Sequence, residues 1–129
     1  MTAITAELII RIHHRIMISS EKEDDPPLAD SIRDKGCLPA IEYGASHIID
    51  PFDRAAYLLY SIATRHPFVE GNKRTAFVAA MVILKKEADV DISESPQSIY
   101  GFVKEVAIGN LSVEEIKKWF KDRIIRPVV

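Results

Sequence analysis

The sequence has one cysteine, Cys37, among its 129 residues and contains no long apolar run. A single cysteine excludes an internal disulfide and a cysteine-based zinc cluster. The apolar runs are too short to cross a bilayer, and the N-terminus lacks the pattern of a signal peptide. Basic residues are not in excess, because the formal net charge is −2. We therefore expect a cytoplasmic protein that binds neither membranes nor, directly, nucleic acid.

Composition places the chain among ordinary globular proteins. Hydrophobic residues make up 47% and charged residues 28% of the sequence, which is typical of a soluble domain. This length is sufficient for one hydrophobic core, and the sequence shows no internal repeat or low-complexity segment. We therefore predict one domain that spans residues 1–129.

The first half of the chain contains one clear helical pattern. Apolar residues recur at every fourth position from Ile4 to Ile16 and predict a helix that ends near residue 20. Residues 21–27, EKEDDPP, combine like charges with two prolines and predict a loop. Gly36 and Pro39 interrupt the following stretch and leave room for short helical pieces only. Residues 45–50 are predicted to be extended, as a short flap.

Stronger signals mark the later helices. Asp50 before Pro51 predicts a helix start, and Pro67 predicts that this helix ends near residue 66. The next helix is predicted over residues 72–86, and its middle is apolar on every side, which is typical of a central, buried helix. Two more are predicted, one from Ser95 to before Gly109 and one that begins at a capping box at residues 112–115 and has an apolar stripe as far as residue 124. No pattern of alternating strands is present, so the sequence predicts an all-α, compact bundle of about six helices.

A polar stretch, RHPFVEGNKR, precedes the most apolar of these helices. The start of a helix leaves about four N–H groups unpaired and carries roughly half a positive charge. Lys73 and Arg74 add cations there, and Gly71 allows a ligand to approach the backbone closely. Because two cations oppose the helix dipole, they destabilise an empty site, and an anion such as a polyphosphate reverses that effect.

Two further residues of this stretch suit phosphate chemistry. Glu70 would repel a phosphate unless a cation such as Mg²⁺ bridges the two. His66 could take a proton from an attacking hydroxyl, since histidine exchanges protons near neutral pH. Each residue taken alone is more often structural, as a helix cap, a turn or a solvated charge. Their occurrence together within residues 66–74 is what favours a functional site.

Residues 66–74, HPFVEGNKR, resemble the signature of the Fic/Doc (Fido) superfamily, His-x-Phe-x-(Asp/Glu)-Gly-Asn-(Gly/Lys)-Arg. Every specified position of that signature is met. Likeness to its Doc (death-on-curing) branch extends to ITAELIIRIHHRI, IRDKGCLPAIE and KRTAFVAAMVILKKEADVDI, and so covers most of the chain. The resemblance implies the Fido fold, a small helical bundle.

The resemblance also implies ATP and Mg²⁺ as cofactors and, by position, a set of site residues. These are the general base His66, the magnesium ligand Glu70, the anion-hole residues Gly71 and Asn72 through backbone and side chain, and the phosphate-holding and catalytic Lys73 and Arg74. Phe68 is expected to be a hydrophobic peg that fixes the loop.

Two departures from the pattern of AMP-transferring Fic enzymes bear on the reaction. Those enzymes have Gly in place of Lys73 and a second Arg in place of Phe77, and that Arg grips the distal phosphate. Both changes match the Doc branch, for which the resemblance implies a reversed nucleotide and phosphorylation of a Ser or Thr hydroxyl. AMP transfer to a protein hydroxyl and a non-catalytic antitoxin-binding module remain alternatives.

Partners follow from the resemblance alone. Doc proteins resemble toxins of toxin–antitoxin pairs, which implies a Phd-like antitoxin and a protein substrate resembling translation elongation factor Tu. The stretch Ile41–Ile49 either docks the target as a flap or is an ordinary connecting loop. His13 and His14 are adjacent on the first helix and are expected to be solvated.

Overall fold

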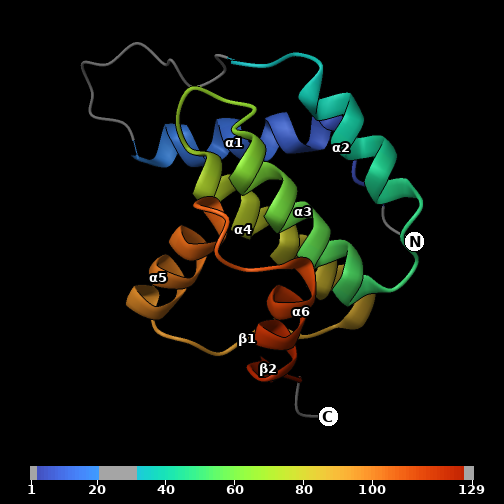
Figure 1. Cartoon of the computed structure of the whole chain (residues 1–129), viewed down its shortest axis with the longest axis vertical. Coiled ribbons are helices and arrows are strands. Elements are labelled where there is room, and N and C mark those ends of the chain that lie inside the picture. The colour runs from blue at the N-terminus through green and yellow to red at the C-terminus, as the bar shows by residue number, and fades with distance from the viewer. Residues whose placement is uncertain (1–2, 21–31, 127–129) are drawn as a thin grey trace.

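Six α-helices form most of the chain in the computed structural model, which describes residues 3–20 and 32–126 (Figure 1). The all-α bundle of about six helices is therefore confirmed. The helices are α1 (Ala6–Ser20), α2 (Cys37–Ser46), α3 (Pro51–Arg65), α4 (Asn72–Ile83), α5 (Pro96–Ala107) and α6 (Val113–Lys121). A π-turn, η2 (Leu84–Ala88), continues α4, and the short strands β1 (Asp91–Ile92) and β2 (Ile124–Ile125) pair antiparallel.

Side chains cap four helices, three of them where the sequence predicts a helix start. The Asp50 carboxylate accepts hydrogen bonds from the N–H groups of Phe52 and Asp53 at 2.8 and 3.0 Å. Such caps satisfy donors that have no partner inside the helix. The capping residues of α1, α3, α5 and α6 are Thr5, Asp50, Ser95 and Ser112, and the last belongs to a complete capping box.

Three local predictions need correction. Pro39 does not interrupt α2, because it lies in the first turn, where a missing N–H costs no helical hydrogen bond. The predicted extended flap over residues 45–50 is wrong in its first half, because residues 45 and 46 belong to the last turn of α2 and His47 is its C-cap with φ −93° and ψ −4°. Ile124 lies in β2 rather than on the apolar stripe of α6, because that helix ends at Lys121.

The predicted helix over residues 72–86 is α4 with its π-turn. It lies between α1, α3 and α5, but it buries one face rather than its whole surface, since Val78 is 36% exposed. The most enclosed helix is α3, which contacts α2, α4, α5, α6 and the π-turn.

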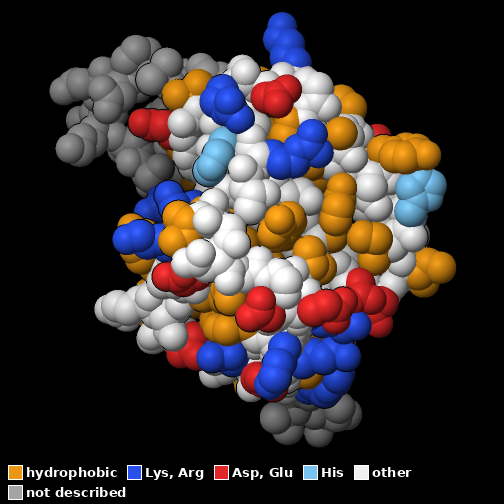
Figure 2. Space-filling view, in the orientation of Figure 1, with side chains coloured by type: hydrophobic (Ala, Val, Ile, Leu, Met, Phe, Trp, Pro, Cys, Tyr) orange, Lys and Arg blue, Asp and Glu red, His pale blue; other side chains and the backbone are white. Residues whose placement is uncertain are grey.

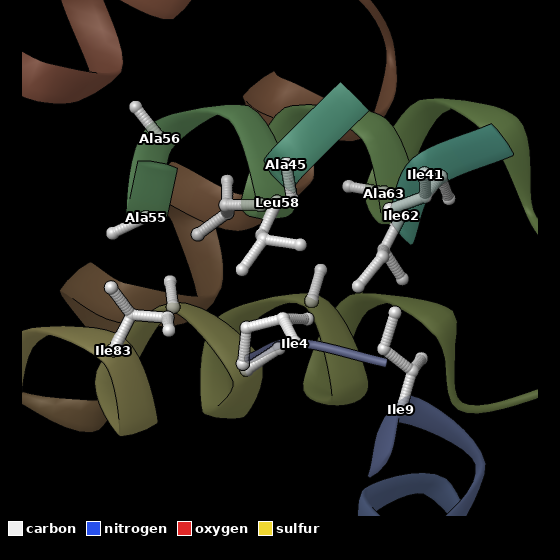
Figure 3. Close-up of a cluster of buried hydrophobic side chains, with 14 of the residues drawn as sticks. Ile4, Ile9, Ile41, Ala45, Ala55, Ala56, Leu58, Ile62, Ala63 and Ile83 are labelled. Atoms are coloured by element: carbon white, nitrogen blue, oxygen red, sulfur yellow. The ribbon is translucent and has the colours of Figure 1, made fainter. Parts of the chain in front are cut away.

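One cluster of buried hydrophobic side chains joins all six helices (Figure 3). In it, Leu58 and Ile62 of α3 point toward α4, which presents the small residues Ala76, Ala79 and Ala80. These small side chains let the two helices pack closely along their length. The loop that joins α3 to α4 is therefore held at one end of a rigid helix pair. None of the described helices is long and apolar enough to cross a membrane.

A buried ion pair fixes the other end of α4. The guanidinium of Arg54, a residue only 1% exposed, donates to the Glu87 carboxylate on the π-turn. The wider turn carries Glu87 to the side of α3, which explains why regular α-helix stops at Ile83. Each charge depends on the other, because an unpaired charge in this position would be costly.

Glu87→Ala should lower the free energy of unfolding by about 3–5 kcal/mol, because it leaves the Arg54 charge buried without its partner. Urea unfolding followed by circular dichroism measures the change. The control is Glu7→Ala, which removes an exposed pair with Arg11 and should leave unfolding nearly unchanged. Equal effects of the two substitutions would refute a structural role for the buried pair.

Candidate active site

A cleft of about 610 Å³ opens where α3 ends and α4 begins, and its wall includes residues of α1 and α5. Figure 2 shows a histidine with Lys and Arg side chains at this end of the molecule. All six residues singled out in the sequence line the cleft, beside Ile16, Met17, Val69 and Tyr100: His66, Glu70, Gly71, Asn72, Lys73 and Arg74. The motif thus forms one continuous surface.

The start of α4 offers unpaired backbone donors to this cleft. Gly71 is its N-cap, with a left-handed φ of 79°, and no side chain caps the helix. The first helical hydrogen bond runs from the Thr75 N–H to the Gly71 carbonyl at 3.0 Å. Among the described residues, none accepts a hydrogen bond from the N–H groups of residues 72–74. An anion bound here would satisfy these donors and the positive end of the helix dipole.

The charged side chains around the cleft are available to a ligand. Glu70, Lys73 and Arg74 are all exposed. Their side chains form no ion pair or hydrogen bond within the part of the chain that the structure describes. Two such cations beside the first turn of α4 favour the binding of an anion over an empty site.

His66 is held in an unusual backbone conformation. It is the C-cap of α3, with φ 50° and ψ 63° in the left-handed region, and its exposed side chain lines the cleft. A residue other than glycine in this region costs about 1–2 kcal/mol. The left-handed turn ends α3 and directs the chain into the loop before α4.

Asn72 braces the loop with its side chain. Its Oδ1 accepts a hydrogen bond from the Phe68 N–H at 2.9 Å, and its Nδ2 donates to the Phe68 carbonyl at 2.8 Å. Both ends of the amide are thus engaged within the motif. The expected anion-hole role of Asn72 stays a prediction, and the donors that this residue can offer an anion are its backbone N–H and the second hydrogen of Nδ2.

His13 is a residue of this site that sequence reasoning placed wrongly. It is fully buried, not solvated, and its ring stacks on Phe68 with centroids 3.7 Å apart and planes 4° apart. Its Nε2 lies 2.7 Å from the Glu70 carbonyl oxygen and donates to it. Phe68 is itself fully buried, so the structural role expected of it is confirmed. The spacing of His13 four residues after buried Ile9 was the signal that could have revealed it.

Gly71 is required by the same contact between α1 and the loop. A Cβ atom there would lie 2.8 Å from the Met17 sulfur and 3.3 Å from the His13 ring. The positive φ of Gly71 further disfavours any other residue. Helix α1 therefore packs directly on the loop at Gly71 and fixes the position of the loop relative to the helices.

Metal binding here could use Glu70 but no larger cluster. Among the described residues, no group of three His, Cys, Asp or Glu side chains is placed to hold a metal ion. A single carboxylate suits Mg²⁺ when phosphate oxygens and waters supply the other ligands.

The one cysteine is not an activated nucleophile. Cys37 is buried, and burial raises the pKa of its thiol.

The stretch Ile41–Ile49 contributes no residue to the lining of the cleft. It leads into the start of α3, whereas His66 follows the end of that helix (Figure 1). The 15 residues of α3 place the end of the stretch about 22 Å from His66, at 1.5 Å per residue. Its start lies closer, because Ile41 packs beside Ile62 and Ala63 (Figure 3). The segment beside the motif is residues 32–34, in which Ile32 forms a β-bridge with Phe68. The docking role of Ile41–Ile49 stays a prediction.

Comparison with known proteins gives the family. The model of the family described as Fic/DOC family matches residues 3–84. The chain belongs to this Fic/DOC family. The match covers α1 to α4 and every residue of the cleft except Tyr100. The chain is also similar to "Toxin Doc" of Mycolicibacterium smegmatis (strain ATCC 700084 / mc(2)155), with 33% identity over 97 residues that cover 66% of this chain and 72% of that protein.

His13→Ala should lower the free energy of unfolding by about 2–4 kcal/mol, because it removes a buried ring and the donor to the Glu70 carbonyl. Amide hydrogen exchange should also quicken in the loop at residues 68–71. Thermal unfolding and exchange measured by NMR test both effects. Arg15→Ala, at an exposed position of α1, is the control and should change neither. A His13 variant with the stability and exchange of the wild type would contradict this role.

Proposed function

We propose that this Fic/DOC protein is a toxin that transfers the γ-phosphate of ATP to a Ser or Thr hydroxyl of a translation factor resembling elongation factor Tu. The observation that carries the proposal is the uncapped start of α4, which shares one cleft with His66, Lys73 and Arg74. The side chains of Lys73 and Arg74 have no partner among the described residues. The name of the relative, Toxin Doc, supports the toxin part of the proposal.

The cleft residues suit a nucleotide triphosphate. Phosphate oxygens would accept hydrogen bonds from the N–H groups of residues 72–74 and would lie near Lys73 and Arg74. Glu70 would be the protein ligand of Mg²⁺, which in such sites neutralises phosphate charge and fixes phosphate oxygens. Without the cation, the Glu70 carboxylate would repel the nucleotide, so ATP and Mg²⁺ are proposed together.

The proposed chemistry needs one proton acceptor, and His66 supplies it. The imidazole would take the proton of the target hydroxyl as its oxygen bonds to the γ-phosphorus. The bond from that phosphorus to the oxygen of ADP breaks, ADP leaves with the electron pair, and His66 later releases the proton to water. Phosphoryl transfer relies mainly on positioning and charge stabilisation, which the backbone donors and the two cations would provide.

The position of Phe77 supports phosphate transfer over AMP transfer. Phe77 lines a second, largely apolar groove of about 510 Å³ together with Val78, Ile99 and Val103. It does not line the cleft that contains His66, although Lys73 and Arg74 line both hollows. At this position the chain offers no cation, whereas the resemblance implies that AMP-transferring Fic enzymes hold the distal phosphate with an Arg there.

The remaining parts of the proposal concern the molecule as a whole. Residues 1–129 are proposed to form one domain, because the buried cluster extends from Ile4 to Phe120. A cell that makes such a toxin must restrain it, so a Phd-like antitoxin is the proposed partner. The cytoplasm is the proposed location, since the proposed substrate acts there.

Labelled ATP distinguishes the reactions directly. Wild-type protein is incubated with Mg²⁺, purified elongation factor Tu and ATP labelled at the α- or the γ-phosphate. We expect label in the factor from the γ-labelled ATP only. Label from α-labelled ATP would establish AMP transfer instead. Nucleotide binding without either label would leave the non-catalytic module as the better account.

His66→Asn should reduce transfer by about 10²–10⁴-fold and leave ATP affinity nearly unchanged, because asparagine tolerates the left-handed backbone but cannot act as the base. Lys73→Ala and Arg74→Ala should instead weaken ATP binding. Initial rates and calorimetric titration measure the two effects. Lys86→Ala, exposed and outside the cleft, is the control. A His66 variant that still arrests growth when expressed would be incompatible with this role.

A further inference from the structure

The end of α3 leaves carbonyl groups that need donors. The last carbonyls of a helix have no partner inside it, and a glycine in the left-handed region most often completes such an end. Here the left-handed residue is His66, with φ 50°, and Pro67 follows it. Proline has no N–H group, so the chain immediately after His66 cannot supply the usual backbone donor.

Arg33 supplies the missing donors from a distant part of the sequence. Its Nε donates to the His66 carbonyl at 2.7 Å, and its Nη2 donates to the Arg65 carbonyl at 2.7 Å. These two carbonyls belong to the peptide planes on either side of the His66 Cα atom. Holding both planes fixes φ and ψ of His66, and therefore the direction in which its side chain leaves the backbone.

Arg33 is itself fastened to the loop. Its backbone N–H donates to the Pro67 carbonyl at 2.7 Å, and the Asp34 N–H reaches the same oxygen at 3.3 Å. The β-bridge between Ile32 and Phe68 adds a further tie. The backbone that carries the Arg33 guanidinium is thus hydrogen-bonded to the motif itself, so the guanidinium keeps its position relative to His66.

We propose that Arg33 is the positioning residue of the reaction, holding His66 in the left-handed conformation that presents its imidazole to the cleft. This inference rests on the proposed role of His66 as the base. Arg33 does not line the cleft, so it acts through His66 and not on a ligand. The planar fork of the guanidinium is needed, because the ammonium group of lysine is one point charge and cannot hold two successive carbonyls in the same way.

The test compares Arg33→Ala, Arg33→Lys and the control Lys35→Ala by steady-state transfer of γ-labelled phosphate, at a temperature where every variant is folded. Lys35 is exposed and lies two residues from Arg33. Its replacement by alanine removes one positive charge, as Arg33→Ala does. We expect kcat to fall about 10–100-fold in Arg33→Ala, because small misplacements of a reacting group cost that much. KM for ATP should stay within about two-fold. Arg33→Lys should lose nearly as much, and Lys35→Ala should match the wild type.

Three results would overturn the inference. Reduced thermal stability with unchanged kcat in Arg33→Ala would make Arg33 a simple helix cap. A raised KM for ATP with unchanged kcat would make it a nucleotide-binding residue. Recovery of full kcat in Arg33→Lys would show that charge, and not the fork, is what matters.

A second measurement separates this inference from the proposed function. If the wild type transfers no label, the proposed function fails, and the geometry is tested by the NMR chemical shifts of the His66 Cα and Cβ atoms. Values in Arg33→Ala that move away from those of a left-handed residue would support the positioning role. Unchanged values would refute it even in an active enzyme.

Discussion

The unpaired first turn of α4 is the feature on which the rest of the site depends. A helix start without a cap is costly when it is buried, since donors are left without partners. Here the N–H groups of residues 72–74 adjoin a cleft, and the two cations beside them pair with no side chain in the part of the chain that the structure describes. The arrangement is poor for stability and good for binding a polyphosphate, which is the opposite of what a purely structural turn would favour.

That turn is useful only because the loop before it is rigid. Three side chains hold the loop from different directions: Asn72 from within, His13 from α1 and Arg33 from the segment before α2. The close packing of α3 on α4 holds both ends of the loop, and the Arg54–Glu87 pair secures the far end of α4. The backbone donors and the proposed base, His66, are therefore fixed in place before any ligand arrives, which is the arrangement that electrostatic catalysis requires.

Local signals in the sequence predicted most of the fold and the contents of the cleft. Caps at Asp50 and Ser112 depend on neighbours within four residues, and the motif is contiguous, so both could be read without a structure. The side chains that hold the site in place could not be predicted in this way. His13 meets Glu70 across 57 positions and Arg33 meets His66 across 33, and a single sequence does not reveal such pairs. The stripe predicted for α1, Ile4 to Ile16 at every fourth residue, also omits Ile9 and His13, which the structure buries.

The most direct test of the central claim is an NMR titration of ¹⁵N-labelled protein with ATP and Mg²⁺, which reports each backbone amide separately. The account predicts that the amides of residues 71–74 shift most and that inorganic triphosphate shifts the same amides. Saturable binding that leaves these amides unmoved, with the largest shifts elsewhere in the described chain, would contradict it.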